Sequence, residues 1–93
     1  MGQKFTRHEA AEVTSGNSFT EVDFDFIAGE AVIVNSGTED IIVRLSGGGY
    51  TGPELIVQSD EVQELALNFE KFEYKSRSAD TPSTFRYIIS EET

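Results

Sequence analysis

Residues 19–45 contain three apolar runs separated by two polar breaks, and this pattern is the strongest structural signal in the chain. In the first run three apolar residues alternate with two aspartates, in the order Val22, Asp23, Phe24, Asp25 and Phe26. Because successive side chains of a β-strand point to opposite faces, a strand over residues 19–27 would turn its aromatic rings to one face and its carboxylates to the other. The pattern therefore predicts a half-buried strand.

Similar short apolar runs recur to the end of the chain, separated by clusters of Gly, Asn, Ser, Asp and Pro. The segment Ala28-Gly29-Glu30 and residues 35–40 are expected to break the first block, and residues 46–54, with four glycines and a proline, are expected to form a loop. In the final run Phe85, Tyr87 and Ile89 share one face, while Arg86 and Ile88 take the other. After residues 19–27, further strands are expected at 31–34, 41–45, 55–57, 62–69, 72–74 and 84–90.

About seven short strands with turn residues between them are typical of an all-β fold. We expect a single antiparallel β-sandwich, jelly-roll-like, or a small barrel, over residues 18–93. Residues 1–17 are polar and small, so the sequence predicts a flexible N-terminal arm there, with a short helix over residues 8–13 as an alternative.

Charge and cysteine content narrow the functional classes. Seventeen acidic residues against seven Lys and Arg give a net charge of −10, which argues against binding to a nucleic-acid backbone. The sequence contains no cysteine, which excludes disulfides and thiolate metal ligands within these residues. No run approaches the roughly 20 apolar residues that a membrane helix needs, so we expect neither nucleic-acid nor membrane partners.

The residues that usually carry catalysis are scarce. His8 is the one histidine, and it lies in the predicted arm, which leaves little material for a histidine base or a multi-histidine metal site. The glycine-rich segment lacks the lysine and hydroxyl of a phosphate-binding loop. Asp23 and Asp25 could act as a pair of catalytic acids or bind calcium. Their alternating positions are better explained as the solvated face of a half-buried strand. The sequence thus predicts a non-enzymatic protein with no catalytic residues, no cofactor and no metal.

Candidate partner contacts lie at the margins of the predicted sandwich. Phe5 is a candidate anchor of the arm on a neighbouring subunit, and the alternative is a frayed terminus. Tyr50 stands alone in the glycine-rich segment, either as a contact residue or folded against the sandwich edge. If Lys75, Arg77 and Arg86 lie on neighbouring strands of a final hairpin, they form a basic patch; the alternative is cross-strand pairing with nearby glutamates.

Several of these segments, FTEVDFDFI, AGEAVIVNSG, IIVRL and NFEKFEYKS, resemble the small β-sandwich accessory proteins of tailed-phage particles, of the head decoration, cement or fibre type. The resemblance implies a virion structural protein, found in virions assembled in the host cytoplasm. It implies partners in a major capsid or other virion protein and in copies of itself, as a homo-oligomer and often a trimer. It carries over no individual functional residues, since such proteins bind through whole surfaces.

A second function is compatible with the same residues. Tyr50 in its glycine-rich segment, together with exposed carboxylates, is also compatible with a carbohydrate- or ligand-binding β-sandwich module.

Overall fold

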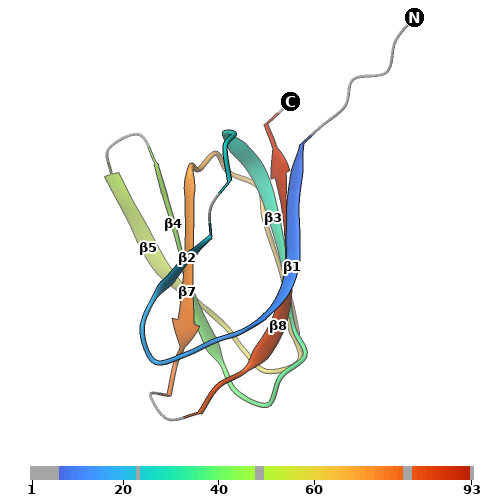
Figure 1. The fold of residues 1–93 in the computed structure, drawn as a ribbon, viewed down its shortest axis with the longest axis vertical. Helices are drawn as coiled ribbons and strands as arrows, with labels where there is room; N and C mark the ends of the chain where they lie inside the picture. The colour runs from blue at the N-terminus through green and yellow to red at the C-terminus, as the bar shows by residue number, and fades with distance from the viewer. Residues whose placement is uncertain (1–6, 23, 48–49, 79–80, 93) are drawn as a thin grey trace, which may run out of the picture.

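The computed structural model describes residues 7–22, 24–47, 50–78 and 81–92, except for the side chain of Tyr50. These residues form an antiparallel β-sandwich of two four-stranded sheets (Figure 1). The strands of the first sheet, in spatial order, are β1 (His8–Thr14), β8 (Thr84–Glu91), β3 (Ala28–Asn35) and β6 (Glu61–Leu65). The strands of the second sheet are β2 (Thr20–Val22), β7 (Lys71–Ser76), β4 (Ile41–Gly47) and β5 (Tyr50–Val57).

The chain passes from one sheet to the other at every connection except the β4–β5 hairpin. This order, with β1 beside β8, β2 beside β7, β3 beside β6 and β4 beside β5, is that of a jelly roll. It confirms the all-β sandwich predicted from the alternating pattern.

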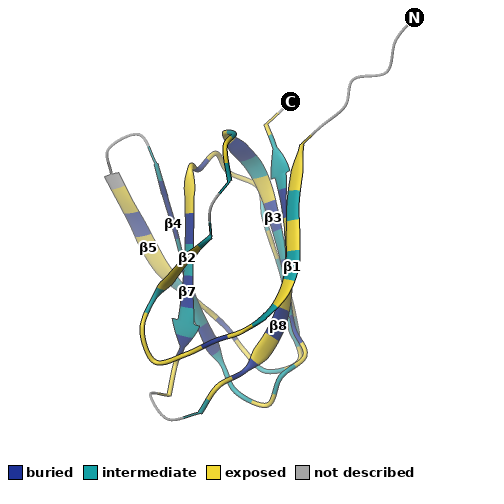
Figure 2. Ribbon diagram, viewed as in Figure 1, coloured by how far each residue is buried: buried dark blue, intermediate teal, exposed yellow. Residues whose placement is uncertain are grey.

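Aromatic side chains fill the space between the sheets. The ring centroids of Phe72 on β7 and Tyr87 on β8 are 5.4 Å apart, and Tyr74 meets Phe85 edge-on at 4.9 Å. Along most strands, more buried residues alternate with less buried ones (Figure 2). Together with Ile89, the rings of β8 are buried, as the alternation over residues 84–90 predicts. Such ring pairs add about 0.5–1.5 kcal/mol beyond their area burial.

Strand β1 differs from the sequence prediction. Residues 8–14 were expected within a flexible arm or as a short helix, but they pair with β8 from His8↔Ser90 to Thr14↔Thr84. The prediction of a helix is therefore wrong, and residues 8–14 of the predicted arm are part of the sheet. Hydrogen bonds to a distant strand stabilise this polar segment, whose few apolar residues are too weak a pattern to predict a strand. Residues 1–6 lie outside the described residues.

Two predicted strands are shorter than expected because the chain must cross between the sheets. Over residues 19–27 only β2 is strand, since residues 24–27 carry the chain from the second sheet to the first. Phe24 and Phe26 still pack against the core, as expected for the aromatic face. Over residues 62–69 only β6 is strand, and Phe69 then forms a single bridge to Ala28.

Two predicted breaks are instead strand. Residues 28–30 begin β3, which accommodates them through a register irregularity between Ala28 and Glu30 opposite β8. Most of the predicted loop at 46–54 forms the β4–β5 hairpin. Pro53 is tolerated there because β5 is an edge strand. Gly52 lies against the β4 backbone, where a Cβ atom would come within 1.9 Å of the Leu45 carbonyl oxygen.

Candidate functional site

The outer face of the first sheet carries aliphatic side chains at its centre. Cross-strand register places Ala10, Ile88, Val32 and Glu64 in one row, and Glu12, Arg86, Val34 and Val62 in the next. Directly opposed residues of antiparallel strands point to the same face. We call five of these residues the apolar face: Ala10, Val32, Val34, Val62 and Ile88.

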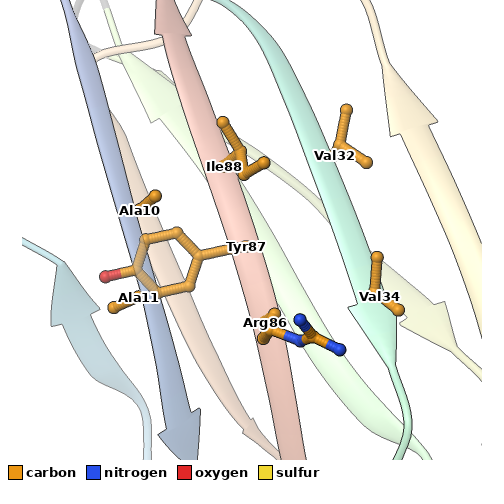
Figure 3. A pocket seen from close by; sticks show the side chains of 7 residues that line it. All are labelled: Ala10, Ala11, Val32, Val34, Arg86, Tyr87 and Ile88. Carbon is orange, nitrogen blue, oxygen red and sulfur yellow. The ribbon is translucent and has the colours of Figure 1, made fainter.

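Two large aliphatic side chains of the apolar face are well exposed to solvent. Ile88 is 48% exposed and Val62 58% exposed. Residues of β1, β3 and β8 line a shallow hollow of about 460 Å³ on this face (Figure 3). Outward positions of a solvated sheet are normally polar, so a contiguous aliphatic group at these positions is a candidate interaction surface.

Charged residues border the apolar face. Arg86 lies 3.8 Å from Glu12, measured from Nε to Oε2, and both side chains are more than 60% exposed. An ion pair this long and this exposed contributes little. Glu64 is exposed in β6, opposite Val32.

The outer face of the second sheet carries a row of charged residues. Arg44 on β4 donates from Nε to Oε1 of Glu73 at 3.1 Å and lies 3.7 Å from Glu54. The hydrogen bond to Glu73 raises the pKa of the Arg44 guanidinium, and the nearby negative charges add to this effect. Phe19 covers this row, with its ring centroid 4.1 Å from Cζ of Arg44 and 4.8 Å from Nζ of Lys75. The charges of this row are therefore paired, while the neighbouring row of the same face places Ile42 opposite Ile56, which is 46% exposed.

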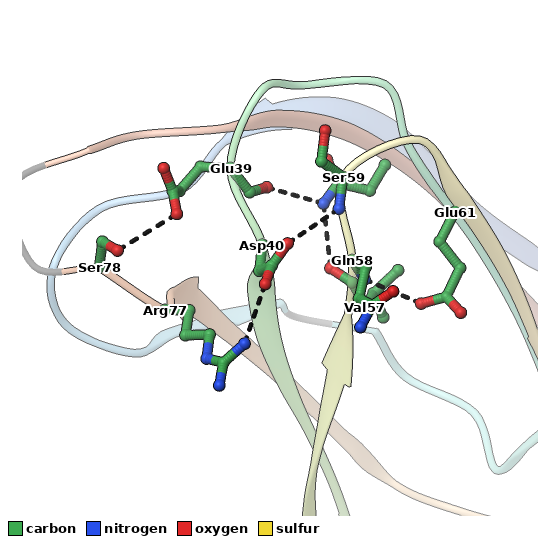
Figure 4. A network of polar contacts seen from close by, with 9 residues as sticks. Glu39, Asp40, Val57, Gln58, Ser59, Glu61, Arg77 and Ser78 are labelled. Carbon is green, nitrogen blue, oxygen red and sulfur yellow. Dashed lines mark hydrogen bonds and ion pairs between the residues drawn. The ribbon is translucent and has the colours of Figure 1, made fainter.

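A polar network joins the loops at one end of the sandwich (Figure 4). Asp40 accepts a hydrogen bond from the backbone N–H of Ser59 and another from Nη1 of Arg77, each at 3.0 Å. The Ser59 hydrogen bond, followed by that of Arg77, lowers the pKa of the Asp40 carboxyl below its ordinary value. Glu39 accepts from the Ser78 hydroxyl, which ties the same loop to the end of β7. These contacts hold loops together and leave few polar groups aimed at a ligand.

The structure separates the predicted basic residues. Lys75 belongs to β7 in the second sheet and Arg86 to β8 in the first, while Arg77 pairs with Asp40 at the loop end. The predicted basic patch on a final hairpin is therefore wrong, because β7 and β8 face each other across the core instead of pairing. The expected pairing with nearby glutamates is not seen among the described residues either: Arg77 pairs with Asp40, Arg86 lies near Glu12, and Lys75 lies over the ring of Phe19.

The other predicted contact residues stay predictions. Phe5 lies outside the described residues. Tyr50 is the first residue of β5, but its side chain is outside what the structure describes.

The acidic pair is also only partly placed. Asp23 is outside the described residues, and the Asp25 side chain is 91% exposed and 3.7 Å from Arg7. Among the described residues, no group of three or more His, Asp or Glu side chains is arranged to hold a metal ion. The described part of the chain also contains no helix long and apolar enough to cross a membrane.

The apolar face itself was missed by the sequence analysis. A signal for it exists, because Ala31–Val34 is apolar at four consecutive positions and Ile88-Ile89 at two, whereas a one-sided strand alternates. Continuous apolar runs indicate a strand covered on both faces.

Comparison with known proteins finds similarity at the level of structure, not of sequence. Neither the family models nor the curated proteins contain a match. One solved structure, described as "Bacillus endospore appendages form a novel family of disulfide-linked pili", is similar over 97% of this chain and 90% of that chain. The TM-score is 0.60 and the sequences are 18% identical. At this identity the likeness shows the shared sandwich fold.

Proposed function

We propose that this protein is a non-enzymatic structural subunit that associates with copies of itself. The apolar face is the observation that carries the proposal. A protein with a net charge of −10 is well protected from nonspecific association, so aliphatic residues clustered on its surface are best explained by a specific partner. The fold likeness to a pilus protein supports a partner of the same kind.

Self-association by this chain would not use disulfides. The solved structure is described as disulfide-linked, whereas the present sequence contains no cysteine. Assembly therefore depends on burial of apolar surface, on charge pairs, and on the unpaired backbone groups of the edge strands. We expect complexes that fall apart in SDS equally with and without a reducing agent.

The finer form of the proposal is a virion accessory protein that binds a capsid or tail surface as a homo-oligomer. The acidic sandwich and its resemblance in sequence style to phage decoration proteins support this form, with assembly in the host cytoplasm. The pilus likeness favours an appendage subunit instead. Both forms are structural, and they differ in what co-purifies with the protein.

Sedimentation velocity over a hundredfold range of protein concentration tests the common element. We expect the sedimentation coefficient to rise with concentration, and a monomer at every concentration would refute the proposal. Mass spectrometry of material purified from the native source separates the two finer forms. Capsid or tail proteins support the virion form, and filaments of this chain alone support the appendage form.

A further inference from the structure

We propose that two copies pack their apolar faces together around a two-fold axis, so that Arg86 of each copy lies opposite Glu64 of the other. This inference rests on the proposed self-association and names the surface responsible for it. The partner is a second copy because each face offers a basic and an acidic residue, and aliphatic residues, that can meet their counterparts on an identical face.

The positions of the two charges follow from strand register. Arg86 on β8 lies opposite Val34, and Glu64 on β6 lies opposite Val32, so the two charges flank β3 on different rows. The midpoint between them falls on β3 between Val32 and Val34. A two-fold axis that lies in the interface and passes through this point, perpendicular to the line joining the charges, exchanges Arg86 with Glu64.

The same rotation matches the aliphatic residues. It brings Val34 of one copy near Val62 of the other, and Ile88 near Val32. The exposed large side chains Val62 and Ile88 thereby become covered. Removal of such side chains from water drives association in proportion to the apolar area buried.

Charge accounts for the choice of partner. Two copies at −10 each repel one another, so an interface between them needs opposite charges in register. Arg86 is suited to this because its contact with Glu12 is long and exposed and leaves donors of the guanidinium available. Two symmetry-related Arg86–Glu64 pairs then border the aliphatic centre.

Charge reversal separates this specific pairing from general charge repulsion. Arg86→Glu changes the net charge from −10 to −12, and Glu64→Arg changes it from −10 to −8. General repulsion predicts that the first variant weakens association and the second strengthens it. Our arrangement predicts that each single variant raises the dimer Kd by about tenfold or more, and that the double variant returns it to within about threefold of wild type.

The measurement is sedimentation equilibrium at fixed ionic strength, with thermal melting to verify that each variant folds. Ile88→Asp provides an independent variant, which should abolish dimerisation and leave the melting temperature nearly unchanged because the side chain is half exposed. The matched control exchanges Lys71 and Glu21, an ion pair of 3.8 Å on the outer face of the second sheet. Lys71→Glu and Glu21→Lys should each change the dimer Kd far less than the Arg86 and Glu64 variants do.

Failure of this inference is distinguishable from failure of the proposed function. A wild-type protein that associates while the Arg86, Glu64 and Ile88 variants associate equally well overturns the assigned surface and leaves self-association standing. Tighter dimerisation by Glu64→Arg, or a double variant as weak as the singles, overturns the charge pairing. A wild-type protein that stays monomeric overturns both.

Discussion

Asn35 donates a hydrogen bond from Nδ2 to the backbone carbonyl of Val57 at 3.0 Å, and so joins the last residue of β3 in one sheet to the last residue of β5 in the other. Its second amide hydrogen reaches the Glu39 carbonyl, and its Oδ1 accepts from the Gly37 N–H and the Ser83 hydroxyl. The side chain is fully buried, and both its donors and its acceptor are used.

Asn35→Asp should strongly destabilise the domain. The variant has nearly the same shape, but it places a carboxylate oxygen against the carbonyl oxygens of Val57 and Glu39, where the amide now donates. We expect a loss of about 2–5 kcal/mol in the free energy of unfolding, from lost hydrogen bonds and from burial of a charge. Urea unfolding at neutral pH measures it. Asn17→Asp, at an exposed position, is the control, and equal losses in the two variants would contradict the assigned network.

Gly52→Ala should also be destabilising. An added Cβ would lie 1.9 Å from the Leu45 carbonyl oxygen, which is backbone and cannot rotate away. Separation of β4 from β5 at this point should cost about 1–3 kcal/mol. Gly16→Ala is the matched substitution, since an added Cβ there meets no atom within 4 Å. If thermal melting shows Gly16→Ala as damaging as Gly52→Ala, the close approach of β4 and β5 is misplaced.

Asp40 should contribute to acid denaturation. Its pKa in the folded protein is lower than the ordinary 3.8, so the unfolded chain binds its proton more readily. The stability that this carboxylate supplies is fully present above pH 3.8 and is lost as the pH falls through the folded pKa. Asp40→Asn should therefore be less stable than wild type at pH 7, with a smaller difference in strongly acidic solution.

Arg77→Gln refines the Asp40 experiment. This variant keeps the hydrogen bond from the Ser59 N–H, which is the larger cause of the shift, and removes the guanidinium. We expect it to retain more of the acid dependence than Asp40→Asn does. Chemical denaturation at several pH values between 2 and 7 measures both variants. An Asp40→Asn protein that stays as far below wild type in acid as at pH 7 would show that the carboxylate is not the titrating group.

Phe19 should stabilise the second sheet through its ring face. The ring lies over the cations of both Arg44 and Lys75, and Phe19→Leu keeps an apolar side chain while removing the π-system. We expect a loss of about 0.5–2 kcal/mol, measured by thermal unfolding at low salt. Phe19→Tyr retains the ring and should melt close to wild type. A Phe19→Leu protein that melts with wild type would show that the ring face contributes nothing.

The fold class can be predicted from the local sequence pattern, but which strands pair with each other in a sheet cannot. The alternation of Phe85, Tyr87 and Ile89 is sufficient to predict a strand with a buried face. The segment His8–Thr14 carries no comparable signal, because its strand conformation depends on hydrogen bonds to β8, seventy or more residues away. A local pattern contains no information about such a distant partner.

The positions of the candidate site residues are limited by the same lack of information about strand pairing. Lys75 and Arg86 are close in sequence and both point outward, yet they belong to different sheets and lie on opposite faces of the molecule. Periodicity fixes which side of its own strand a residue occupies, but it does not fix which sheet that strand joins. The apolar face was accessible in principle through the continuous run at Ala31–Val34, which indicates cover on both sides.

The proposed pairing would limit how many copies can associate through the first sheet. A contact that is related to itself by a two-fold axis is complete with two copies. Pairing of the apolar faces would therefore bury both of them and leave the outer faces of the two second sheets, each with Arg44 and its ion pairs, exposed to solvent. Such a pair cannot grow further through the same contact. A filament or a particle coat must then be built from dimers joined at other surfaces, and the order of assembly would be pairing first and extension second.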